Sequence, residues 1–336
     1  MDVVQRFIAK ARLDPRVIVL PESGDERILR ATEICVREGI ADPVLLGEES
    51  EVRTQAVSLG LDLPSVRIVN PVSASELNRY VKVYREVRVR KNVGERVALR
   101  ILRKPLYFGA MMVRLGEADG MVAGAKTITA SVIRAGELVV GLQEDISTPS
   151  SVFLMEIPGF RGGEDGVLLF SDAAVNADPS PRQLAEIAVT SARTARTLLG
   201  WEPRVAMLSF STKGSAAHRL VEKVVEATEI ARRMDPGLLI DGEIQADAAL
   251  IPEVARRKVK ESSVAGRANI LIFPDLNASN ISYKLVQHLA GARAYGPILQ
   301  GFRRPLSDLS RGASVEDVVG TISMLVVQAQ RQAAAR

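Results

Sequence analysis

The sequence is poor in the residue types that form disulfides and bind transition metals. Cys35 is the only cysteine in 336 residues, and His218 and His288 are the only histidines. One cysteine excludes an intrachain disulfide and a thiolate metal cluster, and the two histidines lack the H-E-x-x-H spacing of a catalytic zinc site. We therefore expect no bound metal and interpret both histidines as surface or core residues.

Long apolar runs are missing as well. No run reaches the roughly 18 residues that a membrane-spanning helix needs. Residues 1–12 have an amphipathic, charged pattern in place of the apolar centre of a secretory signal. Together with the single cysteine, this pattern predicts a cytoplasmic protein with no membrane partner.

Aromatic residues and charge of one sign are scarce. Phe, Trp and Tyr make up 4% of the chain, and 44 Lys and Arg are scattered among 40 Asp and Glu, for a net charge of +4. No basic run is interleaved with aromatic residues, as a surface that stacks nucleic-acid bases requires. The composition favours small anionic ligands and predicts no nucleic-acid partner.

What the sequence does contain is the composition of a globular protein with alternating strands and helices. Hydrophobic residues account for 47% and charged residues for 25%, and 336 residues exceed what one hydrophobic core usually serves, so two domains are expected. Short Val- and Ile-rich runs alternate with longer segments of helical period, which predicts an α/β fold with largely parallel sheets. The expected strands are 16–20, 43–46, 66–69, 121–123, 166–170, 204–210, 269–273 and 298–300, and the expected helices are 25–37, 76–90, 184–199, 217–233 and 279–289. The polar segments 143–149 and 158–166 are the best candidates for a boundary.

Three common active-site motifs are absent. The sequence has no dinucleotide fingerprint G-x-G-x-x-G and no Walker motif G-x-x-x-x-G-K-[ST]. Ser310 lacks the G-x-S-x-G context of a serine hydrolase, because Asp308 stands two residues before it and no histidine follows. Dehydrogenase, NTPase and serine hydrolase functions therefore lose their main support.

Ligands of open α/β sheets bind at the carboxyl ends of strands, and several polar loops follow the expected strands. Residues 119–129 lead into a helix that carries Arg134, and residues 209–215 lead into the helix of Arg219. Each loop is either an anion-binding helix start or a plain helix cap with a glycine turn. The pair Asp241 and Glu243 serves either as metal ligands or as capping groups, of which capping is favoured.

A last segment near the C-terminus also admits two interpretations. Residues 314–317, Ser-Val-Glu-Asp, form an S-x-x-D capping box that opens a helix running to about Gln330. Asp317 is therefore either a helix cap or a functional carboxylate, and both roles can coexist.

Five separated blocks resemble the phosphate acetyltransferase (phosphotransacetylase) family. The strongest is Gly301-Phe302-Arg303-Arg304-Pro305-Leu306-Ser307-Asp308-Leu309-Ser310-Arg311-Gly312-Ala313-Ser314, and the others are 119–125, 166–172, 205–212 and 264–276. The likeness runs in order over nearly the whole chain. Two positions differ from the usual family pattern, with Ser307 in place of Asn and Ala313 in place of Cys.

The resemblance implies two doubly wound α/β domains with an interdomain cleft, the first formed by residues 1–148 plus 298–336 and the second by 149–297. It also implies a homodimer and a reversible reaction in which acetyl-CoA and phosphate give CoA and acetyl phosphate. Coenzyme A is then a substrate, and no permanently bound cofactor is implied. The family's catalytic serine, arginine and acidic base correspond to Ser310, Arg311 and Asp317.

These residue types suit that reaction. A carboxylate can take the proton of the CoA thiol, a serine hydroxyl can stabilise the carbonyl oxygen, and a guanidinium group can bind two phosphate oxygens. In the family, two further arginines correspond to Arg134 and, on less similar flanks, Arg88. The polar loop residues Thr127, Thr129, Ser211, Thr212 and Lys284 are additional candidate substrate contacts. Asp308 is expected to hold the loop. Direct attack in a ternary complex needs no acyl-enzyme.

Two alternative functions remain at this point. A phosphate butyryltransferase would share the motif and accept a longer acyl chain, which depends on pocket volume. A non-catalytic ligand-sensing domain of the kind fused to malic enzymes also resembles this family, but here the Ser310, Arg311 and Asp317 set is intact and no partner domain is attached.

Overall fold

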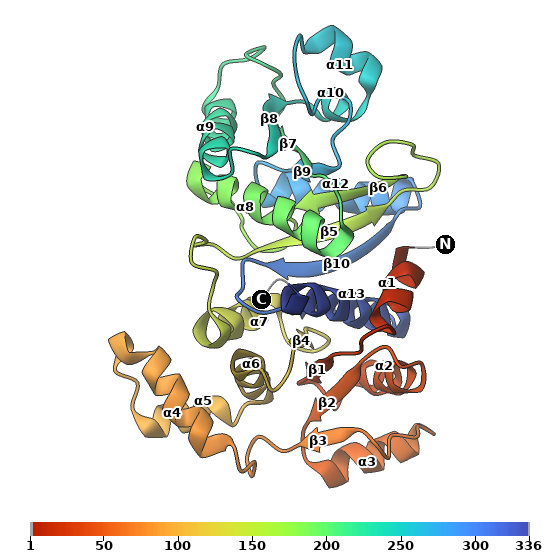
Figure 1. The fold of residues 1–336 in the computed structure, drawn as a ribbon, viewed down its shortest axis with the longest axis vertical. Coiled ribbons are helices and arrows are strands. Elements are labelled where there is room, and N and C mark those ends of the chain that lie inside the picture. The colour runs from red at the N-terminus through yellow and green to blue at the C-terminus, as the bar shows by residue number, and fades with distance from the viewer. Residues whose placement is uncertain (1–2, 335–336) are drawn as a thin grey trace. The chain divides into compact units, whose positions relative to one another are not determined.

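The computed structural model describes residues 3–334, and the chain forms two compact units (Figure 1). Unit 1 comprises Met1–Leu142 and Phe302–Arg336, and unit 2 comprises Gln143–Gly301. The sequence-based expectation placed the changes between domains after residues 148 and 297, whereas the units divide after residues 142 and 301.

Unit 1 contains a parallel sheet with the strand order β3-β2-β1-β4-β11. Its strands are β1 (Val17–Leu20), β2 (Asp42–Leu46), β3 (Arg67–Val69), β4 (Gly120–Ala123) and β11 (Leu306–Asp308). The central strands β1 and β4 are apolar because helices cover both faces of such a sheet; all four residues of β4 are buried. The last strand, β11, comes from the C-terminal segment, which therefore returns to complete the sheet of unit 1.

The helices of unit 1 come from both the N-terminal and the C-terminal part of the chain. They are α1 (Val3–Ala11), α2 (Glu26–Arg37), α3 (Glu49–Ser58), α4 (Leu77–Val87), η1 (Val89–Lys91), α5 (Glu95–Leu102), α6 (Pro105–Leu115), α7 (Thr129–Ala135), η2 (Gly136–Val140) and α13 (Val315–Ala334). Asp25 caps α2 by accepting a hydrogen bond from the N–H of Arg27. α13 packs against α1 and α2 and against β1 and β4, so the C-terminal helix belongs to the core of this unit.

Unit 2 has a mixed sheet with the order β10-β5-β6-β9-β7-β8. Its strands are β5 (Ser150–Glu156), β6 (Val167–Ser171), β7 (Arg204–Leu208), β8 (Leu239–Ile244), β9 (Ile270–Ile272) and β10 (Arg293–Gln300). β5 runs antiparallel to both β6 and β10, while β6, β9, β7 and β8 are mutually parallel. The sheet is therefore parallel except at one edge.

The helices of unit 2 are α8 (Pro181–Thr194), η3 (Ala195–Leu199), α9 (Arg219–Met234), α10 (Ala246–Leu250), α11 (Pro252–Lys258) and α12 (Leu276–Leu289). Figure 1 shows α8 lying across the strands, and α8 packs against β6, β7, β9 and β10. It begins with a capping box between Ser180 and Gln183, with Pro181 at the first helical position. Ten consecutive or near-consecutive residues from Leu184 to Thr194 are buried, which makes α8 the central helix of this unit.

The predicted α/β class and the largely parallel sheets are confirmed. Every expected strand and helix has a counterpart, but the strands β5, β8 and β11 were not expected. β11 is three residues long and ends in Ser307 and Asp308, whose polar side chains conceal a buried strand in the sequence. None of the described helices is long and apolar enough to cross a membrane.

Candidate active site

Ser310, Arg311 and Gly312 form an exposed turn just beyond the end of β11. Asp308, opposite Ala123 of β4, is 1% exposed and Leu309 is 3% exposed, so the chain leaves the core abruptly at Ser310. Ser310 Oγ accepts a hydrogen bond of 3.3 Å from the N–H of Gly312. The hydroxyl hydrogen of Ser310 is thus available to a further acceptor.

The guanidinium group of Arg27, in the first turn of α2, holds this turn in place. Its NH1 donates to the carbonyl oxygens of Arg311 at 2.8 Å and Ala313 at 2.9 Å, and NH2 donates to the carbonyl oxygen of Ala125 at 2.9 Å. Asp25 balances the charge through bonds to Nε and NH2 at 3.0 and 2.9 Å. The hydrogen bond between the two side chains raises the pKa of Arg27 and lowers the pKa of Asp25. One cation therefore fixes the backbone of two loops.

The side chain of Arg311 itself extends from this turn without a partner. Its guanidinium group makes no hydrogen bond or ion pair with any residue between 3 and 334. An exposed guanidinium group with no partner among residues 3–334, beside a serine hydroxyl, is suited to an anion that presents two oxygens to it, such as a phosphate or a carboxylate.

Asp317 lies at the start of α13 and forms the capping box expected from the sequence. Its Oδ2 accepts a hydrogen bond of 2.9 Å from the N–H of Ser314, and Ser314 Oγ accepts one of 3.1 Å from the N–H of Asp317. Asp317 is exposed, and its Oδ1 has no partner among the described residues. The cap therefore engages one carboxylate oxygen and leaves the other available for proton transfer.

The glycine loop that follows β4 is closed by a carboxylate of the protein itself. Glu22 accepts hydrogen bonds from the backbone N–H groups of Gly124, Ala125, Lys126 and Thr127, at 2.7, 2.8, 2.9 and 2.7 Å. Successive N–H groups of this kind form an anion site, which is one of the two alternatives that the sequence left open for this loop. The anion is Glu22, so these four N–H groups are not free to bind a phosphate.

Asp308 and Thr129 connect the end of β11 to the start of α7. Thr129 Oγ1 donates to Asp308 Oδ2 at 2.5 Å, while Asp308 Oδ1 is buried and has no hydrogen-bond partner among the described residues. Burial, with a smaller contribution from the charge of Glu22, raises the pKa of Asp308 to about 7, although the bond from Thr129 opposes this shift. The hydroxyl hydrogen of Thr129 is thus directed to Asp308.

The positive charges of Arg88 and Arg134 both influence the pKa of the buried Tyr84. Arg88 is the half-buried residue after α4, and Arg134 is exposed in the last turn of α7. Burial raises the pKa of Tyr84, and the positive charges of both arginines oppose the shift. Neither guanidinium group has a partner among the described residues. Two unpaired cations from separate helices therefore share one neighbourhood of unit 1.

The loop after β7 in unit 2 is also closed internally. Ser211 is fully buried, and its hydroxyl donates to Glu243 Oε1 at 2.9 Å, which also accepts from the N–H of Gly214 at 2.7 Å. Thr212, 6% exposed, donates to Gln245 Oε1 at 3.2 Å. Both hydroxyls therefore hold the loop in this conformation, and substrate contact by Ser211 and Thr212 stays a prediction.

The other polar candidates of unit 2 are exposed or paired. Asp241 forms ion pairs with Lys213 and Arg232, so it belongs to a salt-bridge network. This favours the structural interpretation of Asp241 and Glu243 over metal binding. Among residues 3–334, no group of three or more His, Cys, Asp and Glu side chains is placed to hold a metal ion. Lys284 is exposed on α12, with its Nζ 5.1 Å from the ring centroid of Tyr283.

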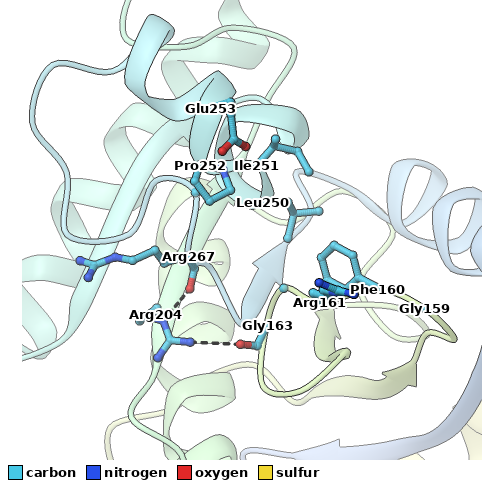
Figure 2. Close-up of a pocket in the computed structure, with 12 residues that line it drawn as sticks. Gly159, Phe160, Arg161, Gly163, Arg204, Leu250, Ile251, Pro252, Glu253 and Arg267 are labelled. Atoms are coloured by element: carbon cyan, nitrogen blue, oxygen red, sulfur yellow. Dashed lines mark hydrogen bonds between the residues drawn. The ribbon is translucent and has the colours of Figure 1, made fainter.

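Unit 2 also contains a cavity of about 690 Å³, shown in Figure 2. Phe160 and Leu250 line it, and Arg204 at its edge donates to the carbonyl oxygens of Arg267 at 2.5 Å and Gly163 at 3.4 Å. Arg204 is the first residue of β7, so the cavity lies at the amino end of that strand. Ligands of α/β sheets bind at the carboxyl ends, and this cavity is therefore not the candidate active site.

Sequence reasoning missed Glu22, Asp25 and Arg27. All three follow β1, in the segment Pro21-Glu22-Ser23-Gly24-Asp25-Glu26-Arg27, at the carboxyl end of a buried strand. The rule that directs attention to loops after strands applies to this segment as it does to residues 119–129. What the sequence does not indicate is that their partners lie about 100 and 285 residues further along the chain.

Comparisons with known proteins agree over nearly the whole chain. The sequence profile of the family described as phosphate acetyl/butaryl transferase matches residues 2–326. The chain is 50% identical over 330 residues to a phosphate acetyltransferase of Thermoanaerobacterium thermosaccharolyticum, which covers 98% of this chain and 100% of the relative. It is 44% identical to one of Acetivibrio thermocellus, over 98% of this chain and 99% of the relative. The crystal structure of a phosphotransacetylase from Streptococcus pyogenes superposes with a TM-score of 0.92 at 41% identity, covering 98% and 99% of the two chains.

Proposed function

This chain belongs to the phosphate acetyl/butaryl transferase family, and from that premise we propose that it transfers an acetyl group reversibly between acetyl-CoA and phosphate. In one direction, acetyl phosphate and CoA give acetyl-CoA and phosphate. Coenzyme A is a substrate in this reaction, and no permanently bound cofactor takes part. The relatives that are 50% and 44% identical are named phosphate acetyltransferases, which supports acetyl over butyryl transfer.

Asp317 is the base in the proposed mechanism. An alkyl thiol has a pKa of about 8.5 and is mostly protonated at neutral pH, so a base must take its proton as sulfur attacks. The exposed Oδ1 of Asp317 suits this step, while Oδ2 remains with the N–H of Ser314. The sulfur forms a bond to the acyl carbon as the proton passes to the carboxylate.

Ser310 and Arg311 stabilise the charges that develop next. The acyl oxygen becomes an oxyanion in the tetrahedral intermediate, and the hydroxyl of Ser310 donates a hydrogen bond to it. The bond between carbon and the bridging oxygen then breaks, and phosphate leaves with the electron pair. The guanidinium group of Arg311 binds two oxygens of this leaving group. Because the thiol attacks the acyl phosphate directly, the reaction proceeds in a ternary complex without an acyl-enzyme.

Arg88 and Arg134 bind anionic groups of the substrates. Coenzyme A carries several phosphates, and the two unpaired guanidinium groups near Tyr84 offer positive charge for them. Lys284 and the hydroxyl of Thr127 are further proposed contacts. Ser211 and Thr212 enter this proposal as residues that shape their loop, since their hydroxyls are bonded inside it.

One observation carries this proposal: the exposed turn that bears Ser310 and Arg311, whose guanidinium group has no partner among the described residues, is fixed by Arg27 and is followed by the exposed Asp317 in the first turn of α13. The test is to mix the purified protein with CoA and acetyl, propionyl or butyryl phosphate and to follow thioester formation. We expect the highest kcat/KM with acetyl phosphate. A preference for butyryl phosphate would favour the butyryltransferase, and no thioester from any of them would refute acyl transfer.

We also propose a homodimer in the cytoplasm, where CoA and acyl phosphates are metabolised. Ile281, Leu285 and Leu289 lie on one face of α12 and are 57, 52 and 81% exposed. An apolar stripe of this kind supports an interface with a second copy of the chain. Leu285→Glu should shift the mass measured by light scattering from dimer to monomer. An unaltered chain that is monomeric at micromolar concentration would contradict the proposed dimer.

A further inference from the structure

Asp308 differs from the other buried or half-buried carboxylates at strand ends. Glu22 accepts four backbone hydrogen bonds, and Asp172 after β6 accepts six hydrogen bonds from four residues. Glu243 accepts two. Asp308, which is 1% exposed, accepts one, from Thr129, and its second oxygen has no partner among residues 3–334. Burying a carboxyl group with so few donors is unfavourable, so its place in the fold needs an explanation.

The hydrogen bond of Asp308 connects two segments of unit 1. Asp308 is the last residue of β11, two residues before Ser310, and Thr129 is the first residue of α7, which carries Arg134. The bond between Thr129 and Asp308 therefore joins the segment that bears the proposed oxyanion donor to the helix that bears a proposed phosphate ligand. It joins them on the buried side of the turn, whereas Arg27 holds the turn from its backbone carbonyls.

Gly124 has no side chain, which leaves space for the carboxyl group of Asp308. A Cβ atom built on Gly124 would lie 2.3 Å from Asp308 Oδ1 and 2.6 Å from the backbone nitrogen of Leu309. Gly124 also has φ +113°, a conformation that residues with a side chain rarely adopt. The carboxyl group thus lies directly against the backbone of the loop after β4, in space that only glycine leaves open. The position of Asp308 is fixed from two sides.

We infer that Asp308 is a positioning residue for the Ser310 and Arg311 turn, and that its hydrogen bond with Thr129 sets the place of this turn relative to α7. Asp308 does not touch the reacting atoms; it acts through Ser310. The inference rests on the proposed acyl transfer, which the unaltered chain tests separately. The raised pKa of Asp308 agrees with this role, because a neutral carboxyl group can remain buried with a single donor.

The experiment is a double-mutant cycle on the two partners of the bond. Asp308→Ala and Thr129→Val should each lower kcat for thioester formation by about 10- to 100-fold, because small displacements of a transition-state donor are costly, with smaller changes in KM. The double variant should be about as slow as the slower single variant, since both changes remove one shared interaction. Losses that multiply in the double variant, or single variants with unaltered kcat, would overturn the inference.

Two conservative variants separate positioning from other roles. Asp308→Asn retains an acceptor for the Thr129 hydroxyl, and Thr129→Ser retains the donor, so each should recover most of the kcat that Asp308→Ala and Thr129→Val lose. If Asp308→Asn were as slow as Asp308→Ala, the acid itself would be required and the positioning role would be wrong. Thermal unfolding identifies any variant that fails to fold. If Asp308→Ala fails to fold, the kcat values of Thr129→Val and Thr129→Ser test the positioning role in its place. An unaltered chain without thioester formation would instead count against the proposed function, and the same cycle measured by urea unfolding would then test the hydrogen bond by itself.

Discussion

The loop after β4 in unit 1 and the loop after β7 in unit 2 both bind a carboxylate of the protein, but the hydrogen-bond donors differ between the two loops. Each loop contains glycine, follows a buried parallel strand and encloses a carboxylate of the protein. In unit 1, Glu22 receives four backbone N–H groups. In unit 2, Glu243 receives one backbone N–H and the hydroxyl of Ser211, and further hydroxyl bonds of Thr212 complete the loop.

The difference shows where substrate anions can bind. Both loops satisfy their own donors, so neither is an empty phosphate site. In unit 1, however, Arg311 on the Ser310 turn and Arg134 on α7 have no hydrogen bond or ion pair with another described residue, whereas Lys213 and Arg232 of unit 2 are paired with Asp241. Anion binding in this chain is therefore expected to depend on guanidinium groups of unit 1 more than on backbone N–H groups.

The same substitution in the two units should give opposite results. Ser310→Ala removes the proposed oxyanion donor and should lower kcat about 100- to 1,000-fold with little change in stability. Ser211→Ala removes a buried donor to Glu243 and should lower the free energy of unfolding by about 1 to 3 kcal/mol while leaving kcat per folded molecule nearly unaltered. Thioester assays and urea unfolding measure both effects. Equal losses of kcat would break the distinction between the two serines.

The two enclosed glutamates should differ in their effect on stability. Glu22→Gln replaces an ionised acceptor of four N–H groups and should lower the free energy of unfolding by about 3 kcal/mol, since bonds to charged groups are the stronger ones. Glu243→Gln, with two donors, should lower it by about 1 kcal/mol. Chemical denaturation gives both values. A larger effect at Glu243 would mean that the side-chain bonds of unit 2 contribute more than the backbone bonds of unit 1.

Arg27→Lys should lower kcat about tenfold, because a lysine ammonium cannot reach three carbonyl oxygens and Asp25 in the planar arrangement of the guanidinium group. Arg30→Lys is the matched control on the same helix, where Arg30 forms an exposed pair with Glu26. Steady-state kinetics of both variants provide the measurement. Similar kcat in the two variants would show that the turn does not depend on Arg27.

A dependence of stability on pH is expected as well. Burial raises the pKa of Asp308 from its ordinary value of 3.8 to about 7 in the folded chain, so the folded state binds this proton more tightly than the unfolded state does. Its contribution to stability is then present at low pH and is lost as the pH rises from about 4 to about 7. Asp308→Asn has no titratable group at this position, so this loss of stability should not occur in the variant. Its stability relative to that of the unaltered chain should therefore increase as the pH rises. Thermal unfolding from pH 5 to 8 measures it; parallel curves would contradict the buried, neutral carboxyl group.

Much of the fold follows from hydrophobic pattern. The runs 16–20, 43–46 and 204–210 are apolar enough to be strands of a covered parallel sheet, and β1, β2 and β7 are found there. β5, β8 and β11 were not predicted, and β5 and β11 escape this reasoning for different reasons. β11 has three residues with two polar side chains, whose burial depends on Thr129 and on neighbouring strands. β5 begins with two serines whose hydrogen bonds to buried partners cannot be read from a local pattern.

The candidate site divides in the same way. Ser310, Arg311 and Asp317 are close in sequence, so the motif alone brings them together. Glu22 and Arg27 act on loops far along the chain, and local patterns carry no information about such pairs. The sequence left the glycine loops open between anion sites and plain helix caps, and only the tertiary structure shows that each loop binds a carboxylate of the chain. Hydroxyls such as that of Ser211 look like ligand contacts in the sequence because their burial is invisible there.

The most direct test of this account is the turnover of Asp317→Asn beside that of Glu316→Gln. The two carboxylates are adjacent and exposed in the first turn of α13, and Asn can still cap the helix through its side-chain oxygen. Thioester formation from CoA and acetyl phosphate should fall about 100- to 10,000-fold in Asp317→Asn, with unfolding unaltered, and should be nearly unaffected in Glu316→Gln. Equal turnover of the two variants would contradict the assignment of Asp317 as the base.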